Sequence, residues 1–489
     1  MKFLLFGTGD YYERYKKWFS REDTLALLDN SLAKQGTWID GIRVLSPEEG
    51  VKQPYEAIVI LSFYVEEMRR QLAGLGVPDR KVFHFYDLHK LIYRKEIKKP
   101  IQYFGDARKL AESSVQTGKK ILLLSQDMTL GGPAIALFHA AQVLKGRGYD
   151  VVYTSMLDGA LREKLLSCGI PAIVDVNLQL ETMKEAEWTG KFSLLICNTI
   201  NFHVFLSNRD TSIPVIWWLH DSEFFYDGVD RKVLQAIDTT NLKICSVGRV
   251  PESAIRKFVP DVSVERLLYG VEDAISLAGK LQYKLSATSK LIERMQGNSL
   301  DTKELLDRVW FVTIGYIEWR KGQDILVRAI QGLPDEVRKK AVFCLIGQDS
   351  SEMAQKLKAE TRHMPEVVVT GTVDRDGIHR LLEATDAMVC PSREDPMPTV
   401  AAEAMMHGVP CIISDAAGTA EYIRDGVDGF VFGREDPQEL SRKLCWCIEH
   451  YEELPAIGIR SRWIYEKNFS MEVFQKGLLE TVGSMLASK

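Results

Sequence analysis

The 489-residue sequence lacks the features that mark several large classes of protein. It has no run approaching about 20 apolar residues, which excludes a membrane-spanning helix. Its formal net charge is -5, so it offers no overall positive field to nucleic acid. The apolar run at residues 3–6 gives way at once to glycine and is unlike a signal peptide. We therefore expect a cytoplasmic protein.

The eight cysteines lack the paired spacing of a metal site. Most stand singly in apolar runs, as Cys197 and Cys344 do, and Cys445-Trp446-Cys447 has the wrong gap and no partner pair. This usage predicts buried thiols in a reducing compartment.

What the sequence does contain is a repeated pattern of a short apolar strand, a polar or glycine turn and an amphipathic helix. Such alternation predicts parallel sheets covered by helices. At roughly 150 residues per domain the length favours about three domains, and the pattern falls into three modules. The expected strands are 3–6, 24–28, 57–62 and 81–85 in the first, 119–125, 151–155, 194–197, 215–219 and 242–246 in the second, and 308–314, 341–346, 367–370, 387–390 and 410–414 in the third.

Polar segments separate the modules. The basic segment 90–100 is interpreted as a linker, with a patch for anionic lipid as the alternative. The stretch 274–303 is expected to be a mostly helical hinge, and 451–489 is expected to be helical.

The segment 312–322 predicts a strand that ends at Gly315 and a helix that begins after Gly322. Glycine lets the backbone approach a ligand closely, and Arg320 and Lys321 supply positive charge. A diphosphate suits this arrangement. A solvated basic turn is the alternative.

The segment 390–410 predicts a helix that begins at Pro398-Thr399 and ends at Gly408. Asp395 precedes this helix, and Glu403 lies a little over one turn inside it. Both carboxylates can accept hydrogen bonds from sugar or ribose hydroxyls, while the helix N-terminus favours an anion. Because alanines and methionines flank Glu403, an idle carboxylate there would be costly, which favours a functional role. The loop around Gly418 is a weaker candidate phosphate contact.

The histidines and one acidic pair allow both a structural and a functional interpretation. His220 follows an expected strand and precedes Asp221, which favours a functional histidine over a structural one. His139 and His407 are interpreted as structural. The acidic pair at 374–376 could suggest a metal site, but it stands directly before a helix, so capping is the expected role.

These ordered motifs resemble those of the retaining GT-B glycosyltransferases, the glycosyl transferases group one family. The family hallmark is Glu-x7-Glu, to which Asp395 and Glu403 correspond, with Asp in place of the first Glu. The family's Arg-Lys-Gly turn, its N-domain Gly-Gly loop and its histidine after a strand correspond to residues 320–322, Gly131-Gly132 and His220. The resemblance covers about residues 119–470.

The resemblance implies an α/β protein of GT-B architecture, with two Rossmann-like domains facing a cleft and a smaller Rossmann-like α/β domain before them. The implied division is an accessory domain at 1–95, a linker at 96–118, an acceptor domain at 119–290, a donor domain at 291–460, and a C-terminal helix at 461–489 that returns to the N-terminal lobe.

It also implies metal-independent transfer of a sugar from a nucleoside-diphosphate-sugar to a glycan, lipid-linked or protein acceptor, without a cofactor or nucleic acid. Glu403 would hold the donor ribose, Arg320 and Lys321 the diphosphate, and Asp395 the sugar hydroxyls, with His220 near the anomeric carbon. The further donor-binding residues implied are Gly131, Gly132, Gly315, Glu394, Thr399, Val400 and Gly418. Surface polysaccharide or glycoconjugate synthesis, with a peripheral membrane contact, is the implied setting. The Asp at 395 and the extra domain keep open an alternative, a non-catalytic GT-B-like protein that binds a glycan or a partner.

The first module begins with Gly7-Thr8-Gly9 directly after a strand, which is similar to the start of a dinucleotide-binding fold. Tyr12 replaces the third glycine, and Asp29 lies where an acidic residue could meet a ribose. A docking or scaffold role and the binding of a nucleotide or nucleotide-sugar are both open. A nicotinamide oxidoreductase is disfavoured because no catalytic constellation accompanies the glycines.

Overall fold

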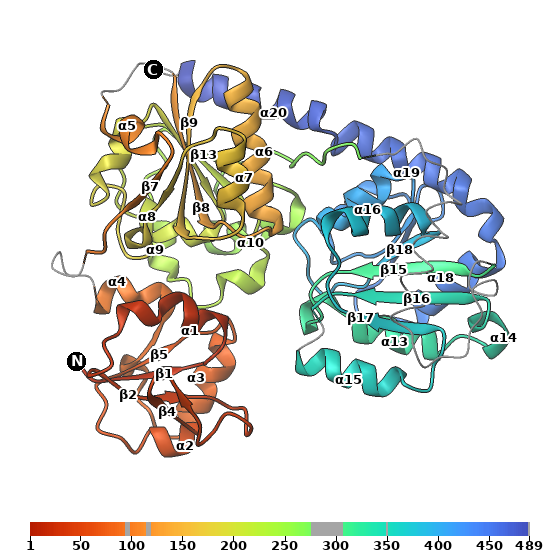
Figure 1. Ribbon diagram of the computed structural model, residues 1–489, viewed down its shortest axis with the longest axis horizontal. Helices are drawn as coiled ribbons and strands as arrows, with labels where there is room; N and C mark the ends of the chain where they lie inside the picture. The colour runs from red at the N-terminus through yellow and green to blue at the C-terminus, as the bar shows by residue number, and fades with distance from the viewer. Residues whose placement is uncertain (93–97, 114–118, 275–306, 349–350, 488–489) are drawn as a thin grey trace. The chain divides into compact units, whose positions relative to one another are not determined.

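The computed structural model describes residues 1–92, 98–113, 119–274, 307–348 and 351–487. Nearly all of the expected hinge at 274–303, and the middle of the basic linker, lie outside these described residues. The chain divides into two compact units (Figure 1). Unit 1 comprises Met1–Cys245, Ala254–Val264 and Val482–Lys489, and unit 2 comprises Ser246–Ser253 and Glu265–Thr481.

The N-terminal domain, residues 1–92 of unit 1, is built on a sheet in the order β3-β4-β2-β1-β5-β6. Its strands are β1 (Phe3–Phe6), β2 (Thr24–Leu28), β3 (Trp38–Ile39), β4 (Ile42–Leu45), β5 (Ala57–Ile60) and β6 (Val82–His84). Its helices are α1 (Asp10–Tyr15), α2 (Pro47–Gly50), α3 (Val65–Gly74) and α4 (Leu88–Leu91). All paired strands run parallel except β3 and β4. The short strands β3 and β4 lie at one edge and were not expected, because β3 has only two residues and Arg43 interrupts the apolar run of β4.

The second sheet, all but the last residues of which belong to unit 1, has the order β14-β13-β12-β11-β8-β9-β10-β7. Its strands are β7 (Gln102–Phe104), β8 (Lys120–Asp127), β9 (Asp150–Leu157), β10 (Ala172–Val174), β11 (Leu194–Asn198), β12 (Val215–Leu219), β13 (Leu242–Ser246) and β14 (Val264–Arg266). The helices that accompany it are α5 (Ala107–Glu112), α6 (Gly132–Gly146), α7 (Leu161–Ser167), α8 (His203–Leu206), α9 (Arg231–Gln235) and α10 (Arg249–Phe258). The segment expected to be a linker at 96–118 thus contains β7, which pairs antiparallel with β10, and α5.

The N-terminal domain shares a hydrophobic core with this second sheet. Phe63 packs edge-on against Phe225, with ring centroids 5.1 Å apart. Trp18 donates its indole N–H to Gln179 at 2.7 Å, and the Tyr86 hydroxyl donates to the side chain of Asn201 at 3.0 Å. The first module is therefore not an independent appendage, although sequence periodicity separates it from the second.

Unit 2 carries a fully parallel sheet in the order β17-β16-β15-β18-β19-β20. Its strands are β15 (Val309–Ile314), β16 (Ala341–Ile346), β17 (Val367–Thr370), β18 (Ala387–Cys390), β19 (Cys411–Ser414) and β20 (Phe430–Phe432). The later helices are α13 (Gln323–Gln331), α14 (Asp335–Arg338), α15 (Glu352–Thr361), α16 (Arg375–Ala384), α17 (Thr399–Met406), α18 (Pro437–Glu449), α19 (Leu454–Asn468) and α20 (Met471–Ala487). The helical expectation for 451–489 is confirmed for the described residues.

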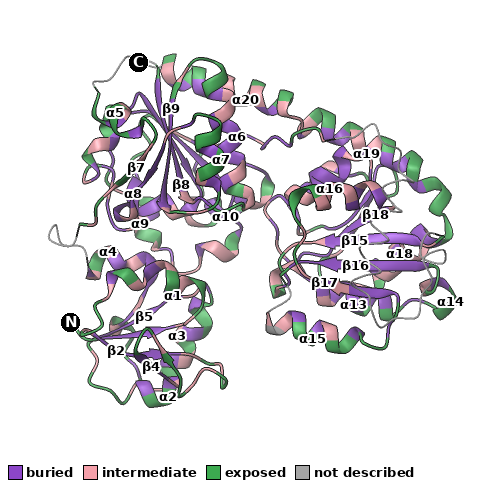
Figure 2. Ribbon diagram, viewed as in Figure 1, coloured by how far each residue is buried: buried purple, intermediate pink, exposed green. Residues whose placement is uncertain are grey.

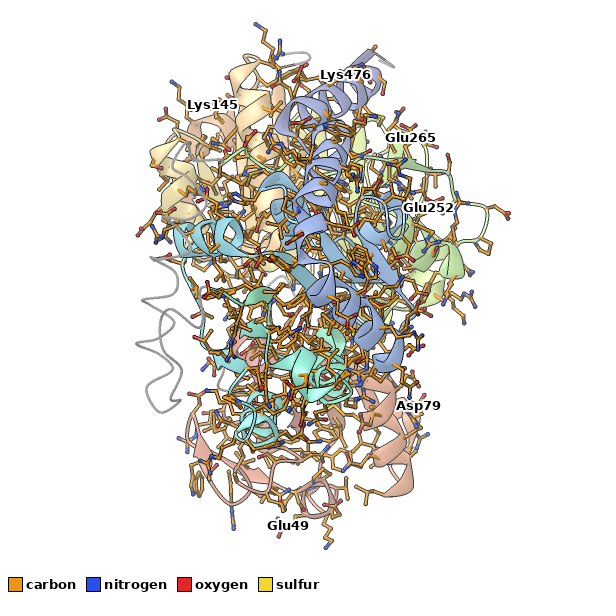
Figure 3. The ribbon with its side chains drawn as sticks, turned by 90° about the vertical axis from the view of Figure 1, so that its right-hand side faces the viewer. Glu49, Asp79, Lys145, Glu252, Glu265 and Lys476 are labelled. Atoms are coloured by element: carbon orange, nitrogen blue, oxygen red, sulfur yellow. The ribbon has the colours of Figure 1, made fainter. Side chains whose placement is uncertain are left out.

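The burial of the strands explains why some of them could be predicted from the sequence. The central strands are purple in Figure 2, and β1, β16, β18 and β19 are buried at every position. A strand covered on both faces appears in the sequence as an uninterrupted apolar run. Charged side chains such as Glu49, Asp79, Lys145 and Lys476 are exposed at the surface (Figure 3).

The last residues of α20 belong to unit 1, where Lys243 Nζ donates to Ser484 Oγ at 3.2 Å. Within the described ranges, no helix combines the length and the apolarity that crossing a membrane requires.

Candidate functional site

In unit 2, the glycine turn lies against the loop that precedes α17. β15 and β18 are neighbouring parallel strands, so the loops that follow them meet at one edge of the sheet. Gly322 has a φ of 68°, and a Cβ there would come within 2.0 Å of the Pro391 carbonyl oxygen. The backbone N–H of Arg393 donates to the Arg320 carbonyl oxygen at 2.8 Å. Glycine is therefore required where the two motifs touch.

Lys321 and Asp395 form an ion pair, with Lys321 Nζ 2.6 Å from Asp395 Oδ2. Asp395 is only 4% exposed, and its other side-chain contact is the Ser392 hydroxyl at 3.5 Å. Arg320 pairs with Glu318 at 2.8 Å and also donates to the Glu394 carbonyl oxygen at 3.1 Å. The structure thus brings together two positive side chains and the residues expected to meet the donor sugar.

Arg393 holds these loops together and was missed by the sequence reasoning. Its guanidinium donates to both carboxylate oxygens of Asp324, at 2.8 and 2.7 Å, and to Glu435 at 2.7 Å. It also lies over the Trp319 ring, 5.0 Å from the centroid. The hydrogen bonds with Asp324 raise the pKa of Arg393. No local pattern reveals this buried network, because its members are distant in sequence.

Glu403 lies on α17 with no solvent exposure. Neither carboxylate oxygen has a hydrogen-bond partner among the described residues. Its ion-pair partner is the guanidinium of Arg375, whose side chain is 54% exposed. Arg375 is the first residue of α16, and its position beside Glu403 was not expected. A buried carboxylate is costly unless it is both paired and hydrogen-bonded, and Glu403 has an ion pair but no hydrogen bond among the described residues, so it is suited to accept hydrogen bonds from a ligand.

Polar side chains beside α17 follow the sequence expectations in part. Asp374 caps α16 by accepting from the Gly377 N–H at 2.7 Å, which confirms the capping role. His379 Nδ1 and His407 Nε2 lie 3.0 Å apart. Burial lowers the pKa of His407 to about 4, so its ring is neutral at neutral pH.

The other unit 2 candidates lie on the same loops. Gly315 directly follows β15 with a φ of 154°. The N–H of Gly418 donates to the Asp395 carbonyl oxygen at 2.9 Å, and a Cβ at Gly418 would lie 1.9 Å from the Pro396 carbonyl oxygen. Thr399 and Val400 are the first residues of α17, and both are half-buried.

In unit 1, His220 and Asp221 directly follow β12. His220 is buried, its Nε2 has no hydrogen-bond partner among the described residues, and its ring centroid lies 4.5 Å from that of Trp218. Burial lowers the pKa of His220 to about 3. Burial also raises the pKa of Asp221 to about 7, although its carboxylate accepts from the Ile200 N–H at 2.7 Å. The site therefore offers a neutral imidazole rather than an imidazolium.

Gly131 and Gly132 begin α6, on the loop that follows β8. Asp127 shapes this loop by accepting from the N–H and the hydroxyl of Thr129, at 3.0 and 2.6 Å. Thr199, after the neighbouring strand β11, has a φ of 78°, which is rare for a β-branched residue. Its carbonyl oxygen accepts from the Trp217 indole at 2.7 Å. Sequence reasoning missed Thr199, because a strained backbone leaves no compositional mark.

Each unit therefore carries its candidate residues on loops at the carboxyl ends of parallel strands, the usual place for ligands in open α/β sheets. Two such units define the GT-B fold, and the α/β expectation is confirmed. Among the described residues, no group of three or more His, Cys, Asp or Glu side chains is placed to hold a metal ion.

Known families match three parts of the chain. Residues 301–463 match Glycosyl transferases group 1, residues 117–245 match Glycosyl-transferase family 4, and residues 1–83 match C2185-like, N-terminal. Together with the fold, these matches support a GT-B glycosyltransferase.

Individual relatives are distant. Spore coat protein SA of Bacillus subtilis is 26% identical over 380 residues, covering 74% of this chain and 98% of its own. An uncharacterized 41.2 kDa protein in the cps region of Klebsiella pneumoniae is 26% identical over 197 residues, covering 37% of this chain and 53% of its own. The chain spans about half the length of the first curated relatives that it matches.

Solved structures show the same fold. Anabaena Alr3699/HepE, in complex with UDP and glucose, has a TM-score of 0.61 and 20% sequence identity, covering 75% of this chain and 100% of its own. At this identity the likeness concerns the fold alone.

Proposed function

We propose that the chain is a retaining glycosyltransferase that moves a hexose from a nucleoside-diphosphate-sugar to a glycan, lipid-linked or protein acceptor. The observation that carries the proposal is Glu403, a fully buried carboxylate that is ion-paired with Arg375 but has no hydrogen bond within the described part of the chain. It lies on the helix that follows the loop holding Asp395, the partner of Lys321. Supporting it, Anabaena Alr3699/HepE was solved with UDP-glucose and with UDP.

In this proposal Glu403 accepts hydrogen bonds from the two ribose hydroxyls of the donor. A vicinal diol supplies two neutral donors, which suits a carboxylate whose ion pair with Arg375 involves only one of its oxygens, Oε1. Arg375 balances the carboxylate charge from the exposed side of the pair and remains solvated. The ribose thus provides the missing hydrogen bonds.

Charge on the departing diphosphate is stabilised by Lys321 and Arg320 without a metal ion. Before the donor binds, Asp395 holds Lys321 at the turn and Glu318 holds Arg320 there. Because these charges are pre-positioned, less reorganisation is needed as the bond to the leaving group breaks. The first residues of α17, Thr399 and Val400, add the N-terminal dipole of an eight-residue helix.

The role proposed for His220 is that of a neutral hydrogen-bonding group at the donor sugar. With a pKa near 3 the ring carries no charge at neutral pH, and its Nε2 is free to bond to a hydroxyl. Gly131 and Gly132 would let the backbone of their loop approach the donor or the acceptor.

The proposed setting is cytoplasmic synthesis of surface polysaccharide or glycoconjugate, with a peripheral membrane contact where the acceptor is lipid-linked. All eight cysteines are free, which suits a reducing compartment.

One alternative is a non-catalytic protein that binds a glycan or a partner. It is favoured by Asp395, which stands where the family has the longer Glu and is already engaged by Lys321. The two functions are separated by incubating the chain with a panel of nucleoside-diphosphate-sugars and detecting released nucleoside diphosphate. Release that Glu403→Gln abolishes supports the enzyme. If no donor is consumed while glycan binding persists, the alternative holds.

A further inference from the structure

The N-terminal domain contains a cavity of about 230 Å³ at the carboxyl ends of β1, β2 and β5. Residues 7–11, 29–30 and 61–62, which follow these strands, line it together with Met68. In the sheet, β2 and β4 lie on one side of β1 while β5 and β6 lie on the other. The cavity therefore occupies a topological switch point, where open α/β sheets characteristically bind ligands.

Asp29, expected from the sequence to meet a ribose, is already engaged. Its carboxylate accepts from the Thr8 N–H at 3.2 Å, the Ser31 N–H at 2.9 Å and Lys34 Nζ at 3.3 Å. Burial acts against ionisation of Asp29, but these hydrogen bonds outweigh it and lower the pKa. Asp29 consequently fixes the shape of the loop Gly7-Thr8-Gly9, and a ligand would be contacted by other residues of the lining.

Those groups are typical of a surface that recognises hydroxyls. Asp10 is an exposed acidic residue of the lining and Ser62 contributes a hydroxyl. The ring of Tyr11 is already stacked on Phe85 and lies under the Arg14 guanidinium, so it forms part of the wall. The side-chain amide of Asn30 is oriented by two hydrogen bonds with Gln71, at 3.1 and 2.9 Å. Amide, carboxylate and hydroxyl groups exchange hydrogen bonds with diols.

The volume and charge of the cavity limit the chemical class of ligand further. The cavity is smaller than the roughly 300 Å³ at which pockets for drug-sized ligands begin. This volume suits a single ring, and a larger ligand such as a dinucleotide would have to extend beyond the cavity. Two acidic residues, Asp10 and Asp29, line the cavity, while the Lys34 ammonium lies beside Asp29 and the Arg14 guanidinium beside Tyr11. The lining therefore carries no net positive charge that would attract a phosphate. We propose that this cavity binds a neutral polyhydroxylated ring, either the pyranose of a sugar or the ribose of a nucleoside.

The cavity adjoins the aromatic cluster that joins the N-terminal domain to the second sheet. Tyr11, on the cavity wall, packs against Phe85 and Phe63, with centroid distances of 4.8 and 4.7 Å. Phe63 in turn contacts Phe225, five residues after His220 (225 − 220 = 5). Ring contacts therefore lead from the cavity wall at Tyr11, through Phe63, to Phe225 in the segment that follows β12.

The test closes the cavity without straining the fold. Gly9 has a φ of -92°, which any residue adopts, and a Cβ there meets no atom within 4 Å. Gly9→Leu therefore adds a bulky side chain at the cavity lining without a clash of its Cβ, and Gly74→Leu, at another glycine with open space in the same domain, is the matched control. The full chain is titrated with glucose, galactose, N-acetylglucosamine, uridine and adenosine, followed by ligand-observed NMR and calorimetry.

We expect one class of probe to bind, at least tenfold more weakly to Gly9→Leu and unchanged to Gly74→Leu. Binding of monosaccharides identifies a sugar as the source of the ring, and binding of nucleosides alone identifies a nucleotide. If no probe binds, or if Gly9→Leu binds as the wild type does, the proposal is wrong. Nucleoside binding that is lost in Glu403→Gln but kept in Gly9→Leu also overturns it, while supporting the donor site. Should circular dichroism show that Gly9→Leu does not fold, Asn30→Ala, at an exposed position, replaces it with the same expected loss.

Discussion

Replacing Glu403 by glutamine should separate function from stability. The substitution keeps the shape of a fully buried side chain and removes its charge. Breaking a buried ion pair usually costs about 3–5 kcal/mol, because the remaining charge is left without compensation. Here the remaining charge is that of Arg375, which is 54% exposed and stays hydrated. We therefore expect the free energy of unfolding of Glu403→Gln to be unchanged or higher than that of the wild type.

The loss in function should be large. Hydrogen bonds to a charged group contribute about 1.5–3 kcal/mol each. A ribose diol makes two such bonds to a carboxylate, and glutamine retains one neutral acceptor. A net loss of about 3 kcal/mol corresponds to a decrease of roughly a hundredfold in kcat/KM or nucleotide affinity at 1.36 kcal/mol per tenfold.

Two measurements on the same variant check this reasoning. Thermal unfolding by circular dichroism reports stability, where 1 kcal/mol shifts Tm by about 2–4 °C in domains of this size. Calorimetry with nucleoside diphosphates reports binding, and Glu360→Gln, on the exposed face of α15, is the control. A Tm lower by 6 °C or more would show that the carboxylate is structural. Unchanged nucleotide affinity would refute its contact with the ribose.

Three further outcomes are expected. Lys321→Ala leaves the buried carboxylate of Asp395 without its cation and should lower the free energy of unfolding, measured by urea denaturation, by about 3–5 kcal/mol. Adding Asp395→Asn should restore most of this stability but not the affinity for a diphosphate. A double variant as unstable as the single one would contradict the ion pair. Burial raises the pKa of Asp221 to about 7, so the folded state keeps a proton that the unfolded state releases, and stability from this group is lost as pH rises from about 4 to about 7. Because asparagine does not titrate, Asp221→Asn should gain stability relative to the wild type between pH 5 and 8. The gain is at most about 4 kcal/mol, for about three pKa units at 1.36 kcal/mol each. A stability difference that does not depend on pH would argue against the raised pKa of Asp221. In thiol labelling, Cys168 should react fast, Cys445 more slowly and the buried cysteines only after unfolding, whereas eight equal rates would contradict the packing.

The candidate site was predictable where it depends on short motifs. A glycine turn with two cations, and a helix that carries a buried glutamate, are local patterns, and both lie where the sequence indicates. What the motifs could not reveal is how their side chains pair. Lys321 contacts Asp395 because β15 and β18 are neighbours in the sheet, and Arg375 reaches Glu403 from a separate helix.

The sequence alone determined the alternation of strands and helices, because a strand buried on both faces must be an uninterrupted apolar run, as in β1 and β16. It did not determine the edge strands β3, β7 and β20, because an apolar run of only two or three residues is too short to indicate a strand. Nor did it show that the first module shares its core with the second. That was decided by contacts such as those of Phe63 with Phe225, between residues far apart in the chain. Hydrophobic periodicity indicates which residues of a segment are buried, and only the tertiary structure shows which other segments they pack against.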